Sequence, residues 1–139
     1  MEQIKFNREN AVFPLGEEGS SEIFSGEAWV CVLMKPTESM QYLIAEVKYN
    51  AGGRTHWHIH PAEQVLLCTD GVGIYQERGK EPKILKKGDV FVIPPFVEHW
   101  HGAKADNRFA HVAITNYKDG KNVDWTVPVN NEEYIDANR

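Results

Sequence analysis

The chain has 139 residues, the length of one ordinary domain, and its shares of hydrophobic (42%) and charged (25%) residues exclude a disordered or fibrous protein. Its formal net charge of −5 argues against a nucleic-acid or membrane partner, because both kinds of partner need clustered Lys and Arg. We therefore expect a small-molecule substrate, no nucleic acid and no membrane.

The N-terminus and the cysteines indicate the compartment. Residues 1–14 mix charged and apolar side chains and lack the apolar core of a signal peptide, and no run of 18 apolar residues follows. Cys31 and Cys68 both lie inside apolar runs, which favours buried free thiols over a disulfide. We expect a cytoplasmic protein.

Short runs of alternating, β-branched or aromatic residues follow one another between Gly and Pro, and no stretch has sustained helical periodicity. The sequence therefore predicts an all-β protein, either a closed antiparallel barrel or a double-sheet jelly roll. An immunoglobulin-like sandwich is the main alternative. The predicted strands are 28–34, 41–49, 54–58, 64–69, 73–77, 82–85, 90–93, 99–101 and 108–115.

The strands predict a single domain with a barrel core at about 28–117, an N-terminal arm at 1–27 and a tail at 118–139. The arm holds strand-like pieces at 11–13 and 22–24. The polar tail has spaced anchors and is expected to pack on the barrel as a loop with one short helical turn. These anchors are Val123, Trp125, Val127 and Tyr134.

Six histidines cluster in the chain, at positions 56, 58, 60, 99, 101 and 111. His56, His58 and His60 share one face of a strand, as do His99 and His101. One metal ion cannot bind all three of the first group on a straight strand, because the outer two would be roughly 13 Å apart. Two of the three can converge where Pro61 ends the strand.

Gln64 is the next polar residue after this cluster, and the apolar run 65–67 follows it. A buried amide oxygen needs a partner, and a cation is a suitable one. His99 supplies a further imidazole just after Pro94-Pro95. Imidazole with an oxygen donor suits Mn, Fe, Co, Ni, Cu or Zn without choosing among them. The alternative is that these histidines are surface residues or satisfied core residues.

At these positions the sequence resembles the cupin superfamily. The first cupin motif is matched in spacing by Gly52, His58, His60, Gln64 and Gly71, with Gln64 in place of the usual Glu. The second is matched by Gly88, Pro94 and His99. Phe96 and Ala103 depart from it, since Gly and Asn are usual there. The resemblance implies a single cupin domain, a double-stranded β-helix of the jelly-roll type.

A closer resemblance, over roughly 42–134, is to bacterial cupin-type hydroxynitrile lyases, which depend on manganese. It includes Trp57-His58-x-His60-Pro61, the run from Glu98 to Ala103, and Asp119-Gly120-Lys121-x-Val123-Asp124-Trp125. It implies one divalent metal, with Mn first and Fe, Ni, Co or Zn as alternatives, bound by His58, His60, Gln64 and His99. It also implies that Ala45, Val47, His101 and His111 line the active site. His56 and Thr115 depart from the lyases and would change the polarity of the pocket.

Strand alternation predicts that Ala45 and Val47 face the barrel interior together with Leu43 and Tyr49, which leaves an apolar pocket beside the metal. If the loop centres near Asp106, His101 pairs opposite His111, and each imidazole lowers the pKa of the other. One of the two could then act as a general base, and His56 is a third candidate catalytic residue.

These features favour an enzyme of the lyase type, which cleaves or forms a carbon–carbon bond with a metal polarising the substrate oxygen and a histidine moving the proton. An iron-dependent cupin dioxygenase and a ligand-binding or sensing cupin remain open. We also expect a homodimer or higher homo-oligomer, because cupins often add N-terminal strand pieces to a neighbouring sheet.

Overall fold

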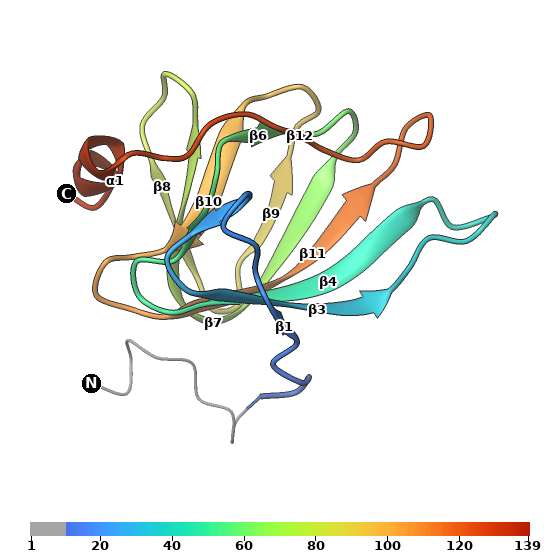
Figure 1. The fold of residues 1–139 in the computed structure, drawn as a ribbon, viewed down its shortest axis with the longest axis horizontal. Helices are drawn as coiled ribbons and strands as arrows, with labels where there is room; N and C mark the ends of the chain where they lie inside the picture. Colours follow the sequence, from blue (N-terminus) through green and yellow to red (C-terminus); the bar gives the residue numbers. More distant parts are fainter. Residues whose placement is uncertain (1–10) are drawn as a thin grey trace.

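A computed structural model describes residues 11–139, which are mostly antiparallel strands (Figure 1). The strands are β1 (Glu17–Glu18), β2 (Phe24–Ser25), β3 (Ala28–Met34), β4 (Tyr42–Tyr49), β5 (Arg54–Thr55), β6 (His58–Ile59), β7 (Gln64–Glu77), β8 (Lys83–Lys86), β9 (Val90–Ile93), β10 (His99–Ala103), β11 (Phe109–Asn116) and β12 (Asp124–Trp125). One helix, α1 (Asn131–Ala137), follows. The all-β prediction is confirmed, and no described helix is long and apolar enough to cross a membrane.

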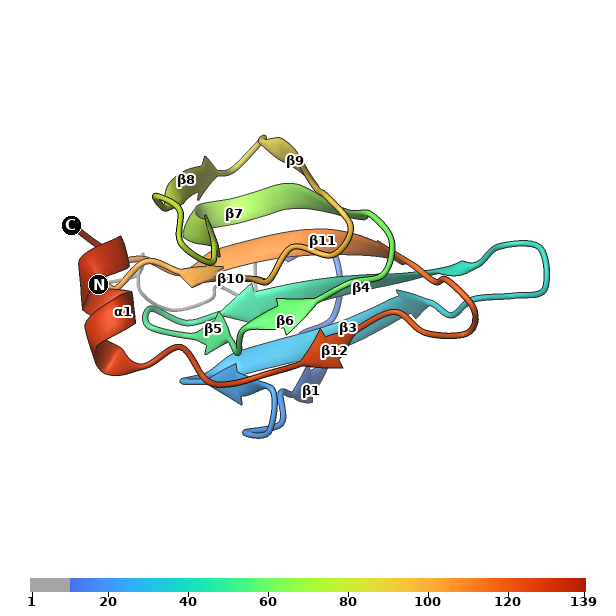
Figure 2. The same cartoon turned by 90° about the horizontal axis from the view of Figure 1, so that it is seen from above.

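The twelve strands form one continuous sheet whose main path is β1-β3-β4-β11-β7-β10-β5-β2. The first half of β7 pairs with β11 and β9, and its second half pairs with β10 and β8. The long strand β7 therefore belongs to both walls of the curled sheet. Figure 2 shows α1 and the 35–41 loop at opposite ends of the molecule.

The predicted break at Asp70-Gly71 is wrong, since β7 continues through it. Gly71 has a φ of 72°, and a Cβ there would lie 1.8 Å from the carbonyl oxygen of Arg108. Only glycine fits this close approach, so the turn signal in the sequence marks a bend within a strand. Thr69 is an extra residue beside the bend, because Ala110 pairs with Asp70 whereas His111 pairs with Cys68. This bulge sets the position of His111.

The predicted strand 54–58 is also wrong as one element, since it is divided into β5 and β6. The backbone N–H of His56 donates to Ile23 (2.8 Å), and that of Trp57 donates to Val127 (2.8 Å). The chain therefore leaves the ladder for two residues and rejoins it at His58. There β6 pairs with β10, with His58 directly opposite His99.

The tail contains more regular structure than predicted, with a strand that pairs with β6 and a seven-residue helix instead of one short turn. Asn130 and Glu133 form a capping box at the start of α1. The pattern of this box in the sequence is an Asn followed three residues later by a Glu. Val127 is 52% exposed, whereas Val129 is buried. The apolar anchor therefore lies two residues beyond the predicted one, and Tyr134 is buried as expected.

A network of charged side chains connects the tail to the barrel. The Arg78 guanidinium lies 3.8 Å from the Trp57 ring centroid and forms ion pairs with Glu98 (2.9 Å) and Glu133 (3.1 Å). The indole of Trp57 donates to Glu133 (3.4 Å). Helix α1 is thereby held near the residues that precede His58.

The N-terminal pieces differ from their predicted form. Residues 11–13 are not in a strand, and of 22–24 only Phe24 is, at the start of β2. Lys48 on β4 is fully buried, forms an ion pair with Glu46 and donates to the Pro14 carbonyl (2.7 Å). These contacts attach the segment before β1 to the outer face of the sheet.

The apolar core lies between the two walls and includes Tyr49, Leu66, Tyr75, Ile93 and Phe109. Both cysteines are free thiols, as predicted, with Cys68 buried and Cys31 partly exposed. A smaller cluster under the tail includes Trp57, Trp100 and Tyr134.

Candidate metal centre

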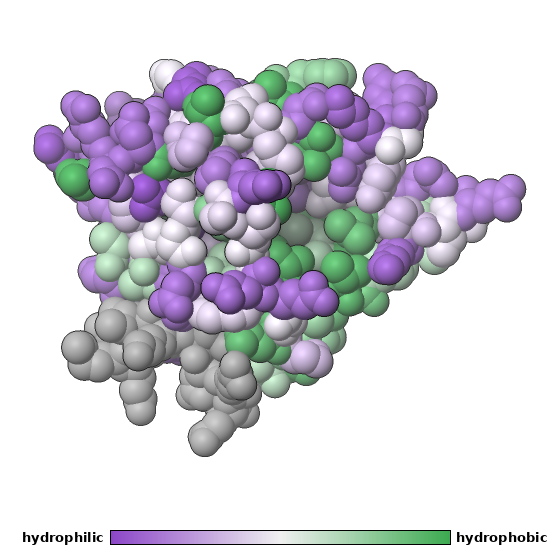
Figure 3. All heavy atoms as spheres, viewed as in Figure 1, coloured by the Kyte–Doolittle hydropathy of each residue, from purple (hydrophilic) through white to green (hydrophobic). Residues whose placement is uncertain are grey.

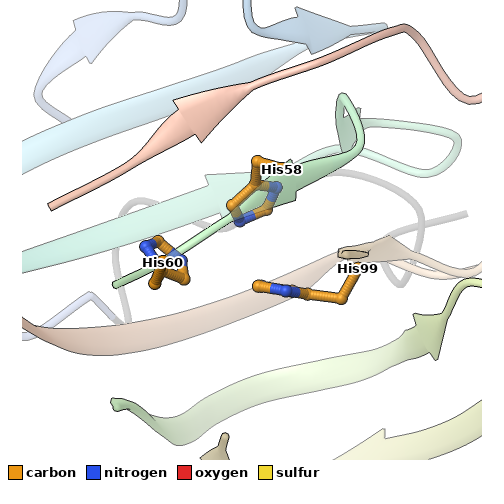
Figure 4. A group of neighbouring side chains, drawn as sticks. All are labelled: His58, His60 and His99. Carbon is orange, nitrogen blue, oxygen red and sulfur yellow. The ribbon is translucent and has the colours of Figure 1, made fainter. Parts of the chain in front are cut away.

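Three histidines from two segments converge at one end of the curled sheet. His58 begins β6, His60 follows it directly before Pro61, and His99 begins β10. One ring nitrogen from each of the three lies within 4.8 Å of the others, and all three residues are buried. Figure 4 shows the three rings around a common space. This group, the histidine triad, has the spacing of a metal site.

Backbone carbonyl groups fix the tautomer of every triad histidine. A carbonyl only accepts, so each Nδ1 carries the proton and each Nε2 is left bare as a ligand. This outer hydrogen bonding is typical of metal-binding histidines. The Nδ1 contacts are His58 with the carbonyl of His56 (2.9 Å), His60 with that of Asn122 (2.6 Å) and His99 with that of Val97 (3.0 Å).

Gln64 is oriented by Thr115. The Gln64 amide nitrogen donates to the Thr115 hydroxyl (2.7 Å), and its Oε1 is buried with no hydrogen-bond partner among the described residues. The Nε2 atoms of His60 and His99 are also buried without a partner. Buried polar atoms of this kind are rare unless a ligand satisfies them. A divalent metal fits this set, with Gln64 as the oxygen donor.

Thr115 was predicted from the sequence only as a residue of the substrate pocket. It does line the cavity described below, and it also holds the Gln64 amide. A threonine followed by an asparagine at the end of a strand carries no local signal of such a contact. The contact depends on the pairing of Thr115 with Gln64 across β11 and β7.

The electrostatics of the triad favour neutral rings. Burial lowers the pKa of His99 to about 4. Burial also lowers the pKa of His58 well below its usual value, and repulsion from His99 and His60 adds to the effect. The pKa of His60 is lowered by burial, against the hydrogen bond to Asn122. Neutral imidazole is the form that binds a metal ion.

A cavity of about 290 Å³ opens beside the triad. Leu43, Ala45, Val47 and Tyr49 of β4 all line it, as strand alternation predicted. No Asp, Glu, Lys or Arg is among the described residues that line the cavity. Figure 3 shows hydrophobic residues gathered over β3, β4 and β11 on the face drawn. The other apolar lining residues are Ile23, Phe24, Val30, Ala113, Val123 and Trp125.

His101 and His111 both line the cavity, but the predicted pairing of their strands is wrong. His101 on β10 pairs with Tyr75 of β7, and His111 on β11 pairs with Val47 of β4. The rings approach each other across the interior, with centroids 5.0 Å apart. The Tyr49 hydroxyl lies between them, 3.1 Å from His101 Nδ1 and 2.9 Å from His111 Nε2. The proximity that we expected therefore comes from the curl of the sheet.

His56 is not brought to this group. It is buried but does not line the cavity, and burial lowers its pKa against hydrogen bonds to the backbone of Phe24 and Glu22. The bend between β5 and β6 separates it from His58. The structure thus places His56, the remaining histidine of the run, where β2 is attached to the sheet.

The tail completes the site through contacts with two of the triad histidines. The ring of Trp125 lies 4.6 Å from that of His58, and Asn122 supplies the carbonyl for His60. Trp125, Val123 and Asn122 all line the cavity. Val123 and Trp125 were predicted as anchors of the tail on the barrel, and the run 119–125 also belonged to the resemblance, but neither pattern predicted a place beside the histidine triad.

Acid is expected to destabilise the metal-free protein through His111. Burial lowers the pKa of His111 from 6.5 to about 3 in the folded state. Between those values the unfolded chain binds a proton that the folded chain does not, so stability is full above pH 6.5 and falls toward pH 3. The loss is on the order of 5 kcal/mol for this one group.

Urea denaturation of the metal-free protein across that pH range measures the effect. The free energy of unfolding should change less steeply with pH in His111→Gln than in the wild-type protein. Equal slopes in the two proteins would show that His111 is already able to bind a proton in the folded state.

Comparison with known proteins identifies the family. Residues 45–115, about half of the chain, match the sequence profile of the Cupin domain. This chain belongs to the cupin superfamily. Both the predicted fold and the predicted family are confirmed, and an immunoglobulin-like sandwich is excluded.

Individual relatives of this cupin extend the comparison. An (R)-mandelonitrile lyase of Granulicella tundricola is 35% identical over 117 residues, which cover 84% of this chain and 89% of the lyase. A cupin-like protein of Thermotoga maritima has a solved structure with a TM-score of 0.89 and 43% identity, covering 92% of this chain and 97% of that one.

A more distant similarity shows the fold alone. A DMSP lyase from Ruegeria pomeroyi has a TM-score of 0.62 at 17% identity, over 91% of this chain and 61% of that one. Cupins with related structures thus include enzymes, while the reaction of this cupin has to be argued from its own site.

Proposed function

We propose that this cupin is a metal-dependent lyase that cleaves and forms the carbon–carbon bond between a carbonyl carbon and cyanide. The observation that carries the proposal is the pair His101 and His111 in an apolar cavity beside the histidine triad. A simple binding site has no need of two imidazoles beyond the ligands. The similarity to an (R)-mandelonitrile lyase over most of both chains supports the same class.

The metal ligands that we propose are His58, His60, Gln64 and His99. A divalent metal bound there would supply Lewis acidity toward the substrate oxygen. The neutral amide of Gln64 in place of a carboxylate leaves one more unit of positive charge on the site. Manganese is the metal we propose, from the resemblance to manganese-dependent lyases, because the donor set by itself suits several metals.

The two cavity histidines would move the proton. In cleavage the hydroxyl proton of the cyanohydrin passes to a bare imidazole nitrogen, and the carbon–oxygen bond becomes a carbonyl. The bond to cyanide breaks with its electron pair on cyanide, which takes up a proton and leaves as hydrogen cyanide. Burial lowers the pKa of both His101 and His111, so both rings are neutral near pH 7 and each has one bare nitrogen toward which the proton can move.

The cavity indicates an uncharged substrate with an apolar substituent. Its walls are aliphatic and aromatic, and no charged side chain is among the described lining residues. A carboxylate on the substituent, away from the proposed metal, would lose its hydration with no cationic side chain to pair with it, at a high cost in free energy. An aryl or alkyl cyanohydrin avoids that cost, since its only polar groups are the hydroxyl and the nitrile.

The proposal is tested with racemic mandelonitrile and manganese-loaded protein. We expect release of benzaldehyde and cyanide above the rate of metal-free protein, and faster synthesis of one enantiomer in the reverse direction. Equal rates with and without manganese would overturn the lyase assignment. Substrate-dependent oxygen uptake with ferrous iron in place of lyase activity would also overturn it, in favour of a dioxygenase. Tight binding of mandelonitrile without turnover would indicate a binding cupin.

We also propose that the protein forms a homodimer through the outer face of its sheet. Ile44, Ile114, Val65 and Val92 lie side by side across β4, β11, β7 and β9, on the face opposite the cavity. Val92 is 55% exposed, and Val90 next to it is 66% exposed. Apolar rows of this length on a surface commonly mark a protein interface. In the arm, β1 pairs with β3 and β2 pairs with β5.

Light scattering measures the mass of the assembly. The wild-type protein should have about twice the monomer mass of 15.8 kDa, whereas Val92→Arg should be monomeric because a charge on the apolar face cannot be buried without a partner. A wild-type mass near 15.8 kDa would overturn the proposal.

A further inference from the structure

The Tyr49 hydroxyl connects the two cavity histidines. It lies 3.1 Å from His101 Nδ1 and 2.9 Å from His111 Nε2, and these are its hydrogen-bond partners in the described part of the chain. Tyr49 and His111 are fully buried and His101 is 4% exposed. The other nitrogens of the rings, His101 Nε2 and His111 Nδ1, are buried with no partner from residues 11–139.

The hydroxyl has one proton to donate, which limits how the two rings can be protonated. If Tyr49 donates to His111 Nε2, that nitrogen is bare, and His101 Nδ1 must carry a proton to donate to the Tyr49 oxygen. Both rings then carry the proton on Nδ1. If Tyr49 donates to His101 Nδ1 instead, both rings carry it on Nε2.

Mixed arrangements lose a hydrogen bond. Two bare nitrogens facing Tyr49 would compete for one proton. Two N–H groups facing Tyr49 would leave the phenolic proton buried without an acceptor, which folded proteins avoid. Burial raises the pKa of Tyr49 well above its usual value, so the phenol keeps its proton.

We propose that Tyr49 is a positioning residue that forces His101 and His111 into the same tautomer. The consequence concerns the two unpartnered nitrogens. When His101 Nε2 is bare, His111 Nδ1 carries a proton, and the reverse holds in the other arrangement. The pair therefore always presents one acceptor and one donor, and both change together when the hydrogen bonds through Tyr49 reverse direction.

The pairing of one acceptor nitrogen with one donor nitrogen suits the proposed lyase reaction, and its role in catalysis rests on that proposed function. Cleavage of a cyanohydrin needs a group that accepts the hydroxyl proton and a group that donates a proton to the departing cyanide. Without this coupling, the two unpartnered nitrogens, His101 Nε2 and His111 Nδ1, could both be bare or could both carry a proton. Coupling through Tyr49 removes those unproductive combinations before the substrate arrives.

The tautomers can be measured directly by nitrogen NMR on protein with ¹⁵N-labelled histidine. Zinc-loaded protein is used, since zinc is diamagnetic, and signals are assigned with His101→Gln and His111→Gln. We expect His101 and His111 to show the same tautomer, or the same ratio of the two forms. Opposite tautomers in the wild-type protein, in either of the two mixed combinations, would overturn the proposal.

Tyr49→Phe keeps the ring and removes only the hydroxyl. In this variant His101 and His111 should no longer share a tautomer. A bare nitrogen of each ring should face the phenyl ring, so that His101 carries its proton on Nε2 and His111 carries its proton on Nδ1. Zinc content should stay at the wild-type level. The control is Tyr134→Phe, which removes another buried hydroxyl, the one that donates to the Ala103 carbonyl. This control should leave both histidine signals unchanged, and an unchanged match in Tyr49→Phe would overturn the role of Tyr49.

Kinetics provide a second readout. With mandelonitrile, Tyr49→Phe should lower kcat about 10- to 100-fold while KM changes little, because the substrate still fits but the proton donor and acceptor are no longer paired. If the protein has no activity on cyanohydrins, the proposed lyase function is wrong. The tautomers of His101 and His111 would still test the coupling through Tyr49.

Discussion

Replacing His99 with alanine is expected to remove the bound metal. His99 supplies one of three imidazoles whose nitrogens lie within 4.8 Å of one another, and its Nε2 is already oriented by the Nδ1 contact with Val97. Loss of even an outer partner of a metal ligand weakens metal affinity roughly 10- to 100-fold, and loss of the ligand itself should do more. Elemental analysis after manganese loading and gel filtration should show near-zero occupancy, and His58→Ala should behave alike.

Two variants provide matched controls. His56→Ala removes a buried histidine from the same run, but His56 does not line the cavity, so metal occupancy should stay complete. Gln64→Glu keeps an oxygen donor and should retain metal. Full occupancy in His99→Ala would remove His99 from the proposed ligand set.

Alanine at His101 or His111 is expected to abolish most of the lyase activity without releasing metal. Both rings line the cavity, and neither is needed to complete the histidine triad. Removal of a positioned general acid or base typically lowers the rate 10²- to 10⁴-fold. Turnover of mandelonitrile and metal content should be measured on the same samples, so that a loss of rate is not confused with a loss of metal.

Each other outcome has a definite meaning. Turnover retained at full metal occupancy in both variants would show that these histidines are structural. Loss of metal from His101→Ala would identify His101 as a ligand. His101 is close to the triad, because its ring centroid lies 5.3 Å from that of His58 and 5.7 Å from that of His99.

The sequence by itself determined the all-β class, several of the longer strands and most of the residues of the site, because these depend on local patterns. Strand β3 was predicted at its observed bounds, and β9 was as well, since alternating or β-branched runs end at Gly or Pro. The spacing of the histidines identified two groups that share a strand face, because side chains two residues apart lie on the same side. The choice of His58, His60 and His99 within these groups came from the resemblance to cupins. Gly71 shows the limit of such signals, since a glycine marks a turn or a close approach equally well.

Only the tertiary structure decided which distant residues meet. The tail places Asn122 and Trp125 against the triad, and the Tyr49 hydroxyl lies between His101 and His111 from separate strands. These contacts join residues more than fifty positions apart. They depend on strand pairing, the bulge at Thr69 and the curl of the sheet, all of which arise from the packing of the whole chain and leave no periodic trace in the sequence.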